Sequence, residues 1–432
     1  MVSISAVTAA LRNSYAAIGK PQKILVGLSG GADSVALLLA LCELRKDTAL
    51  HLRAVHVNHG LRETAERDTA FCRELCSRLE VPLAVEYVHI TAKSNIEAAA
   101  REERYRVFHQ EIDRHSVQSL ALAHHLDDQA ETVVMHLLHG AGSTGLGGMQ
   151  PVNGKIWRPF LHLRRDELRA YLLANGQNWC EDESNADLAF TRNRIRSQVI
   201  PVLEACAPEA VASIGRTAQI LQDEDDCLNA MADAWLSKYA AKGSFHFLMI
   251  EPFVEQHIAM QRRILRRYMQ RFGVITDFEQ TERIRVLSLA NSGSVENLPG
   301  DRHAFRSKTR LHVISDHNTC SNAALGELLA DDCSASSSLK QLFPPEQANN
   351  LELRTRKTGD YIQPFGMLGT KSLKEYMIDH DLDRPFRDAW PLVCRGKEVL
   401  WVIGIGASEK LRVHEGEQSL QLIYKGDLPD EL

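Results

Sequence analysis

The first half of the chain alternates short apolar runs with longer segments whose apolar residues recur at helical spacing. The apolar runs are residues 23–28, 52–57, 83–89 and 119–123. The helical segments are residues 34–44, 66–79, 96–113 and 127–138. Short runs without polar interruption are typical of strands buried on both faces. The alternation therefore predicts an α/β unit, in which a parallel sheet is covered by helices on both sides.

The pattern changes after residue 200. Residues 210–236 and 258–271 predict helices beside many charges, and residues 310–314 predict a strand. Residues 316–338 are rich in Asn, Asp, Ser and Ala, which indicates a linker. From residue 351 onward, short strands and turns surround one helix at residues 371–379. We expect a parallel-sheet domain (1–208), a mainly helical middle domain (209–315), a linker (316–345) and a small α+β C-terminal domain (346–432).

Composition narrows the class of protein without naming a function. The 432 residues are 44% hydrophobic and 25% charged, which is enough apolar material for large cores and argues against wholesale disorder. The formal net charge of −6 excludes an overall basic field of the kind that small nucleic-acid-binding domains show. An anionic partner would have to be bound by local basic patches.

The start of the chain and its cysteines indicate the cellular compartment in which the protein is expected to act. The first twenty residues lack the basic head and unbroken apolar core of a signal peptide, and no later segment is long enough to span a bilayer. The nine cysteines are an odd number and include no C-x-x-C. Cys72 and Cys76, one helical turn apart, are expected to pack in a core rather than bind a metal. We therefore expect a reduced, cytoplasmic protein that does not act at a membrane.

The sharpest chemical signal lies directly between the first strand and the first helix of the alternation. Free backbone N–H groups at such a turn favour an anion, and two glycines let the backbone approach it closely. Serine hydroxyls add donors, and Asp33 can hold a magnesium ion on bound phosphates. The alternative is an ordinary glycine turn with a Ser/Asp helix cap. The predicted phosphate loop comprises Ser29, Gly30, Gly31, Ala32, Asp33 and Ser34.

This SGGADS segment resembles the SGGxDS loop of the N-type ATP pyrophosphatase (PP-loop) superfamily, whose members cleave ATP between the α and β phosphates and adenylate a substrate. Further segments resemble the tRNA(Ile)-lysidine synthetase family. They are residues 56–62 (HVNHGLR), 99–105 (AAREERY), 124–132 (HHLDDQAET), 140–149 (GAGSTGLGGM), 182–185, 191–196 (TRNRIR) and the unit from residue 354 to 391. One departure is His139, which stands where a basic residue is expected before the glycine-rich loop.

The resemblance implies a reaction with ATP and Mg as cofactors. ATP would adenylate the wobble cytidine of the isoleucine tRNA with a CAU anticodon, and free L-lysine would then displace AMP. Residues 1–208 would be the ATP pyrophosphatase catalytic domain and residues 346–432 a tRNA-binding domain. Asp33, His124, Asp128 and Glu131 would be catalytic, with His56 and Arg101 at the ATP and Asp128 and Glu131 at lysine.

Helical spacing is compatible with this assignment. His124, Asp128 and Glu131 fall at i, i+4 and i+7, so on a helix they share one face. Two other interpretations stay open for these residues: a capped, solvated helix terminus and a set of metal ligands at helical spacing. For His56, a structural role and a position facing the nucleotide are equally compatible with its place at a strand end.

Two basic clusters suit the backbone of an RNA. Arg192, Arg194 and Arg196 form the first, and Arg356, Lys371 and Lys374, beside Arg354 and Lys357, form the second. Each could instead be a solvated face. Two other functions are compatible with the loop: a different PP-loop adenylase of the thiolase type, and a non-catalytic RNA-binding protein that keeps the ATP fold. The pattern leaves open whether the chain acts as a monomer or as a homodimer.

Overall fold

A computed structural model of the chain describes residues 4–60, 65–88, 96–181, 190–240, 247–315, 327–330, 339–380, 382, 384–414, 419–425 and 428. Its contacts divide it into two units, Met1–Asp226 and Cys227–Leu432. Arg62, residues 182–185 and most of the expected linker lie outside the described residues. Among the helices that the structure describes, none combines the length and the apolarity needed to cross a bilayer.

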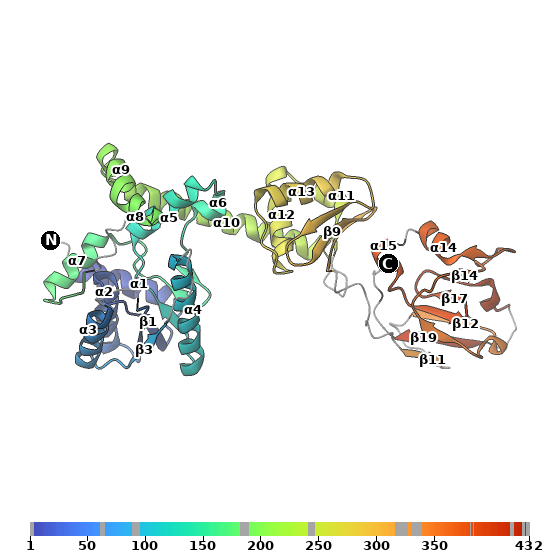
Figure 1. The fold of residues 1–432 in the computed structure, drawn as a ribbon, viewed down its shortest axis with the longest axis horizontal. Coiled ribbons are helices and arrows are strands. Elements are labelled where there is room, and N and C mark those ends of the chain that lie inside the picture. Colours follow the sequence, from blue (N-terminus) through green and yellow to red (C-terminus); the bar gives the residue numbers. More distant parts are fainter. Residues whose placement is uncertain are drawn as a thin grey trace. The chain divides into compact units, whose positions relative to one another are not determined.

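The first unit is built on a six-stranded sheet (Figure 1). Its strands are β1 (Lys23–Gly27), β2 (His51–Asn58), β3 (Leu83–Tyr87), β4 (Ser119–Ala121), β5 (Val152–Asn153) and β6 (Ile156–Trp157). They are ordered β3-β2-β1-β4-β6-β5, and every neighbouring pair except β5 and β6 is parallel. The α/β class predicted from the alternation is confirmed. The strand order reverses between β1 and β4, which is where such sheets bind ligands, beyond the carboxyl ends of the strands.

The helices predicted for this unit are present, with ends that differ by a few residues. They are α2 (Ala32–Lys46), α3 (Ala65–Arg78), α4 (Ile96–His115) and α5 (Leu126–Leu138). The unit also contains helices that the sequence pattern did not indicate: α1 (Ile4–Ala17), α6 (Ser143–Leu146), α7 (Arg165–Ala174), α8 (Thr191–Arg194) and α9 (Ile200–Cys206). A π-helical turn, η2 (Ile195–Val199), joins α8 to α9. The long helix α10 (Ala210–Tyr239) starts in the first unit and ends in the second.

Alternation along β1 places side chains on both faces of the sheet. Ile24 and Val26 belong to the core that α1, α2 and α7 cover, whereas Leu25 belongs to the core that α4 covers with Phe108. The sheet is thus buried on both sides, which explains the unbroken apolar run in the sequence. The two cysteines of α3, Cys72 and Cys76, are buried in the first of these cores, as expected.

The second unit contains separate apolar cores. The first lies among the end of α10, α11 (Ile250–Val254), α12 (Ile258–Gln270), α13 (Phe278–Leu289) and a four-stranded antiparallel sheet. That sheet has the order β7-β10-β9-β8 and comprises β7 (Phe247–Met249), β8 (Val295–Leu298), β9 (Arg302–Arg306) and β10 (Arg310–Ser315). The sequence indicated only the last strand, because the others are short and none alternates clearly between buried apolar and exposed polar residues.

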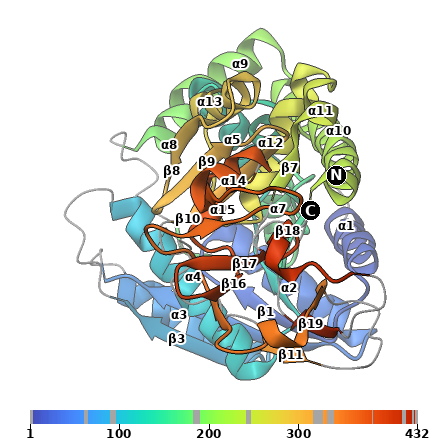
Figure 2. The ribbon, with the colours of Figure 1, turned by 90° about the vertical axis from the view of Figure 1, so that its right-hand side faces the viewer.

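The C-terminal part is α+β, as predicted. Its strands are β11 (Glu327–Ala330), β12 (Leu339–Phe343), β13 (Glu352–Arg354), β14 (Tyr361–Ile362), β15 (Lys371–Ser372), β16 (Leu392–Arg395), β17 (Glu398–Val402), β18 (Gly406–Ala407) and β19 (Leu420–Lys425). The helices are α14 (Leu373–Asp379) and α15 (Arg384–Arg387). The antiparallel pair β16 and β17 is visible in Figure 2.

Arg354, which the sequence grouped with the second basic cluster, is instead part of the buried interior of this domain. Its side chain is 6% exposed, and its Nη1 and Nη2 donate to Asp360 Oδ2 and Oδ1 at 2.7 and 2.9 Å. Nη2 also donates to the carbonyl of Gly396 at 2.6 Å. The Arg354 guanidinium therefore holds the chain around residues 354–360 together rather than offering a charge to RNA.

We expect Asp360→Asn to destabilise this domain by about 3 kcal/mol, because it removes the charge of the buried carboxylate that pairs with the Arg354 guanidinium. Burial by itself raises the pKa of Asp360, but the Arg354 hydrogen bond and the Lys357 backbone N–H outweigh it and lower that pKa. The stabilisation of the domain by ionised Asp360 is fully present above the pKa of Asp in the unfolded chain. It is lost as the pH falls through the lower pKa that Asp360 has in the folded domain. Hydrogen exchange of β16 and β17 amides in the full chain measures both effects. Equal protection of variant and parent, at neutral and at acid pH, would contradict the prediction.

Candidate functional site

The predicted phosphate loop leaves β1 and enters α2 with its serines turned inward. Ser34 Oγ accepts from the Ser29 backbone N–H at 3.1 Å and donates to the Gly31 carbonyl at 3.0 Å. The two hydroxyl oxygens lie 3.0 Å apart, and Ser29 Oγ accepts from Gly31 N–H at 3.3 Å. Gly30 has a φ of +90°, and a Cβ there would lie 3.3 Å from the sulfur of Cys72. The backbone conformation therefore favours glycine at position 30, and a Cβ there would also crowd Cys72.

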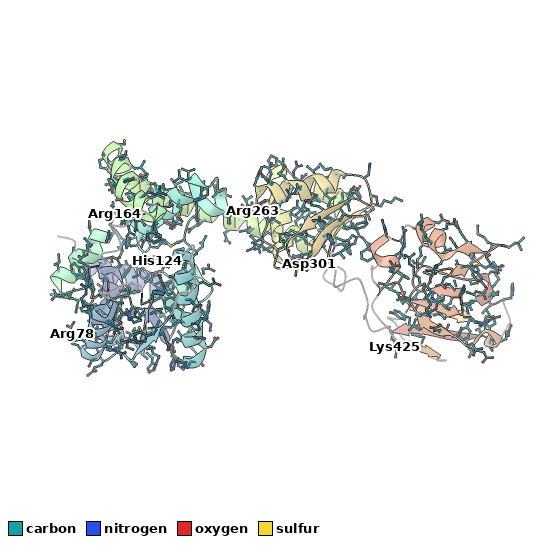
Figure 3. All side chains as sticks on the ribbon, viewed as in Figure 1. Arg78, His124, Arg164, Arg263, Asp301 and Lys425 are labelled. Atoms are coloured by element: carbon teal, nitrogen blue, oxygen red, sulfur yellow. The ribbon has the colours of Figure 1, made fainter. Side chains whose placement is uncertain are left out.

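A cleft of about 720 Å³ opens at this loop, at the carboxyl ends of β1, β2 and β4. Most of the residues predicted to bind ATP line it: Ser29, Gly31, Ala32, Asp33, Ser34, His56 and Arg101. His124, Asp128 and Arg196 also line the cleft. Gly30, Glu131, Arg192 and Arg194 are not among its lining residues. Figure 3 labels His124 at this part of the first unit.

Asp33, at the end of the predicted phosphate loop, lies in the first turn of α2. Its Oδ1 atom is buried and has no hydrogen-bond partner among the described residues, while its side chain as a whole is 32% exposed. Asp33 Oδ2 lies 3.5 Å from His125 Nε2. In the described part of the chain, no three His, Cys, Asp or Glu side chains converge as a metal cage. One free carboxylate oxygen at a phosphate loop fits Mg²⁺, which usually takes one or two carboxylates together with substrate phosphates.

His125, which the sequence analysis did not single out, joins the loop to the next helix. It caps α5: its Nδ1 accepts from Asp128 N–H at 3.3 Å, and its own N–H donates to Asp128 Oδ2 at 3.1 Å. Its Nε2 faces Asp33 Oδ2 and Asp128 Oδ2 at 3.5 and 3.4 Å. Burial opposes protonation, but the hydrogen bond to Asp33 and the charges of Asp128, Asp33 and Asp127 outweigh it and raise the pKa of His125.

His124 precedes α5, which begins at Leu126. The prediction that His124 shares a helical face with Asp128 and Glu131 is therefore wrong, because the chain is not yet helical at residue 124. Burial lowers the pKa of His124 to about 4, so its ring is neutral at physiological pH. Its Nδ1 is buried without a partner among the described residues.

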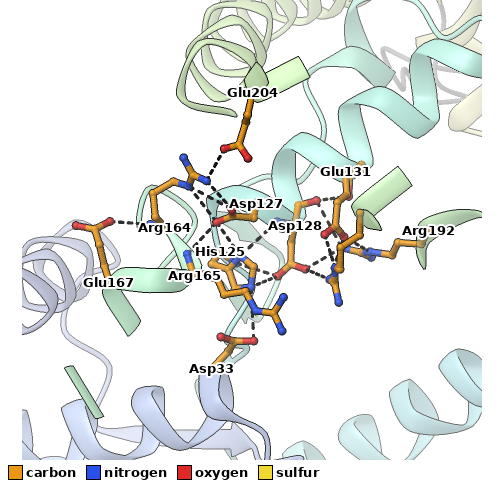
Figure 4. A network of polar contacts seen from close by, with 12 residues as sticks. Asp33, His125, Asp127, Asp128, Glu131, Arg164, Arg165, Glu167, Arg192 and Glu204 are labelled. Atoms are coloured by element: carbon orange, nitrogen blue, oxygen red, sulfur yellow. Dashed lines mark hydrogen bonds and ion pairs between the residues drawn. The ribbon is translucent and has the colours of Figure 1, made fainter. Parts of the chain in front are cut away.

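Asp128 and Glu131 do share one face of α5, and both are paired with arginines (Figure 4). Arg192 donates from Nε to Glu131 Oε2 at 2.9 Å and from Nη2 to Asp128 Oδ1 at 3.1 Å. Arg196 donates from Nε to Glu131 Oε1 at 2.6 Å and from Nη2 to Asp128 Oδ1 at 3.2 Å. The sequence grouped these arginines with an RNA-binding cluster, whereas the structure brings them to the carboxylates.

Asp127, beside this pair, anchors the start of α7. Its two oxygens accept from Arg164 Nε at 3.2 and 3.3 Å, and Oδ2 also accepts from the Arg165 backbone N–H at 2.8 Å. Arg164 Nη2 in turn donates to Glu204 Oε1 at 2.8 Å. Asp127, Arg164 and Glu204 thus tie α5, α7 and α9 together and fix the orientation of the neighbouring acidic residues.

The other predicted ATP-binding side chains have contrasting surroundings. Both ring nitrogens of His56 are engaged within the protein, Nδ1 with the Leu28 carbonyl at 2.9 Å and Nε2 with Thr69 Oγ1 at 3.1 Å. Only the ring itself is left to contact a ligand in the cleft. Arg101 is exposed on α4, with its guanidinium 5.2 Å from the ring centroid of Tyr105.

The remaining predicted RNA-binding residues lie at the surface. Arg194 is exposed and donates to Thr191 Oγ1 at 3.1 Å. In the C-terminal domain, Arg356 pairs with Asp388 and Lys371 with Asp379. Lys374 is exposed on α14.

A phosphate loop at the switch point of a parallel sheet defines a nucleotide-binding enzyme domain. A family model of the PP-loop domain matches residues 4–203, and a model of the TilS substrate C-terminal domain matches residues 351–424. The first unit is thus a PP-loop domain, a class that uses ATP.

Curated relatives match almost the whole chain. The tRNA(Ile)-lysidine synthase of Caldanaerobacter subterraneus subsp. tengcongensis is 33% identical over 443 residues, covering 95% of this chain and 95% of the relative. That of Clostridium perfringens (strain ATCC 13124) is 31% identical over 450 residues, covering 94% and 96%. That of Chromobacterium violaceum is 43% identical over 215 residues, 48% of each chain. The chain belongs to the tRNA(Ile)-lysidine synthase family and is a ligase.

Proposed function

We propose that this protein joins lysine to the wobble cytidine of the isoleucine tRNA with a CAU anticodon, producing lysidine, AMP and pyrophosphate. The cytosine carbonyl oxygen attacks the α-phosphorus of ATP and pyrophosphate leaves. The ε-amine of lysine then forms a carbon–nitrogen bond with the activated ring carbon, the amine loses a proton, and AMP leaves. The observation that carries the proposal is the set of acidic side chains at the edge of the phosphate loop, Asp33, Asp128 and Glu131.

The residues of the cleft have distinct parts in this reaction. The backbone N–H groups and serines of the loop bind the phosphates of ATP, and the His56 ring and Arg101 border the nucleotide. Asp33 would hold Mg²⁺, which neutralises phosphate charge when it is bound. Buried His124 stays neutral on the nucleotide side.

Asp128 and Glu131 receive lysine. The ε-ammonium has an ordinary pKa near 10.4 and must lose a proton before it can attack. A carboxylate beside it both compensates its charge in the cleft and accepts that proton. Burial raises the pKa of Asp128, but His125, Arg192 and His124, together with the His125 backbone hydrogen bond, outweigh it and lower that pKa. Asp128 is therefore ionised at physiological pH.

An assay of pyrophosphate release with ATP, lysine and isoleucine tRNA tests the proposal. We expect release that depends on the tRNA and a product that contains one lysine per tRNA. A thiolase-type adenylase would release pyrophosphate without incorporating lysine, and a non-catalytic RNA-binding protein would release none. Because these substrates meet in the cytoplasm, we also propose a cytoplasmic location.

The basic residues of the C-terminal domain give a separate prediction about tRNA binding. Replacing Arg356, Lys371 and Lys374 together by Ala should weaken tRNA binding on the order of tenfold or more. The log–log salt dependence should flatten by roughly two to three units, because up to three phosphate contacts and their released counter-ions are lost. Filter binding across a salt series measures both quantities.

ATP affinity should be unchanged in this triple variant. A charge-matched control replaces three exposed lysines of the first unit, Lys20, Lys46 and Lys155. If the control flattens the salt dependence as much as the triple variant does, the C-terminal cluster has no special part in RNA binding.

A further inference from the structure

The carboxylate pair to which the proposed function assigns lysine is already filled by cations of the chain itself (Figure 4). All four of its oxygens have partners. Asp128 Oδ1 accepts from both arginines, and Asp128 Oδ2 accepts from the His125 backbone N–H at 3.1 Å. Glu131 Oε1 accepts from Arg196, and Glu131 Oε2 accepts from Arg192 at 2.9 Å and from Arg196 at 3.0 Å. An incoming ammonium group therefore meets no vacant oxygen on this pair.

The charges of the cluster are also balanced before any ligand arrives. Two carboxylates face two guanidinium groups, and the side chains of Asp128 and Glu131 are only 13% and 3% exposed. A third cation added to this cluster would be repelled by both arginines in a place with little water to screen the charge. Lysine can therefore use the pair only if a guanidinium group leaves it.

Arg196 is the better placed of the two arginines to leave. It lines the cleft, whereas Arg192 does not. It also lies in the π-helical turn η2, between the α-helical segments α8 and α9. Single π-helical turns inside α-helices occur frequently at functional sites. A change from π-helical to α-helical hydrogen bonding in η2 would rotate the residues of this turn relative to the carboxylate pair.

We propose that Arg196 is a resident substitute for the lysine ammonium group, which lysine must displace to bind. This inference rests on the proposed function. A tethered guanidinium competes at a high effective concentration and pairs well with carboxylates. A ligand displaces it only with additional contacts, which the α-amine and α-carboxylate of lysine can supply. A simple alkylamine has the same ammonium group and lacks those contacts.

Lysine binding to the full chain, measured by equilibrium dialysis with labelled L-lysine, tests the proposal. Arg196→Gln should bind lysine about tenfold more tightly than the parent, because the free energy spent on opening the pair is no longer required. Binding of n-butylamine should improve by a similar factor, because the same opening free energy is removed for both ligands. The matched control is Arg216→Gln on α10, an exposed arginine that donates to Ser213 Oγ at 3.1 Å, which should leave both affinities unchanged.

Rescue experiments separate displacement from a merely structural effect. Millimolar guanidinium chloride should compete with lysine in Arg196→Gln and leave lysine binding to the parent unchanged. Arg196→Lys keeps the tethered charge without the planar fork, so its lysine affinity should lie between those of the parent and Arg196→Gln. Thermal unfolding reports whether each variant is folded. If Arg196→Gln does not fold, Arg196→Lys decides alone: tighter lysine binding than in the parent supports the proposal.

Lysine binding to a folded Arg196 variant that is equal to or weaker than that of the parent would overturn the proposal. It would mean that both arginines stay in place and that lysine does not compete with Arg196. The failure of the proposed function is a different result, in which the parent incorporates no lysine into tRNA. If the parent incorporates lysine and the Arg196 variants bind it no more tightly, only the present inference fails.

Discussion

Asp33→Asn should abolish pyrophosphate release, with a fall in rate on the order of a thousandfold or more, while the fold stays intact. The substitution keeps the shape of the side chain and removes the charge that the proposed function gives to Mg²⁺. Charge stabilisation by a bound metal contributes several kcal/mol to such a transition state, and each 1.36 kcal/mol is a factor of ten in rate. Single-turnover pyrophosphate release with saturating ATP and tRNA measures the effect.

The surroundings of Asp33 indicate that stability should change little. Its Oδ1 has no partner among the described residues, and its side chain is one-third exposed, so few contacts are lost. The control is Asp166→Asn, which changes an exposed acidic residue in the first turn of another helix, α7. This control should release pyrophosphate at the parent rate. Turnover at the parent rate in folded Asp33→Asn would remove Asp33 from the catalytic assignment.

Asp128→Asn should weaken lysine binding by about ten- to a hundredfold and leave adenylation of the tRNA largely intact. A charge-assisted hydrogen bond contributes roughly 1.5–3 kcal/mol, which corresponds to that range of affinity. The variant should therefore release pyrophosphate but transfer lysine poorly, so that adenylated tRNA accumulates or hydrolyses. Following pyrophosphate and labelled lysine in the same reaction separates the two steps.

Glu131→Gln should show the same defect together with a loss of stability. Glu131 does not line the cleft, and it accepts hydrogen bonds from both arginines in a buried position. Removing one partner of a buried ion pair costs roughly 3–5 kcal/mol, so thermal unfolding should report this loss of stability. If both variants keep the parent's apparent lysine affinity, lysine is held elsewhere and the assignment of this helix is wrong.

The arrangement of the first unit was largely predictable from local pattern. Parallel strands that are buried on both faces have unbroken apolar runs, and the helices that cover them have apolar residues at helical spacing. The strands and helices of residues 23–138 could therefore be predicted from the sequence. The phosphate loop was readable as well, because its chemistry depends on residues that are consecutive in the chain. The sheet of the middle region was missed except for β10, because short strands exposed on one face have no such signature.

The partners of the acidic residues could not be found in the same way. Arg192 and Arg196 lie more than sixty residues beyond Asp128, and their spacing fits a solvated basic face as well as it fits a pair of counter-ions. The position of His124 was misjudged because the helix starts two residues later, where His125 caps it. A capping residue has a local signal, and the histidine next to an acidic first turn could have been noticed.

The sequence by itself determined the fold class of the first unit, its phosphate loop and the acidic residues beside that loop, since each depends on neighbours in the chain. Only the tertiary structure decided which charges face one another. It placed Arg354 against Asp360, Arg164 against Asp127, and Arg192 and Arg196 against Asp128 and Glu131. The physical reason is that an ion pair depends on distance in space, whereas the sequence records only distance along the chain.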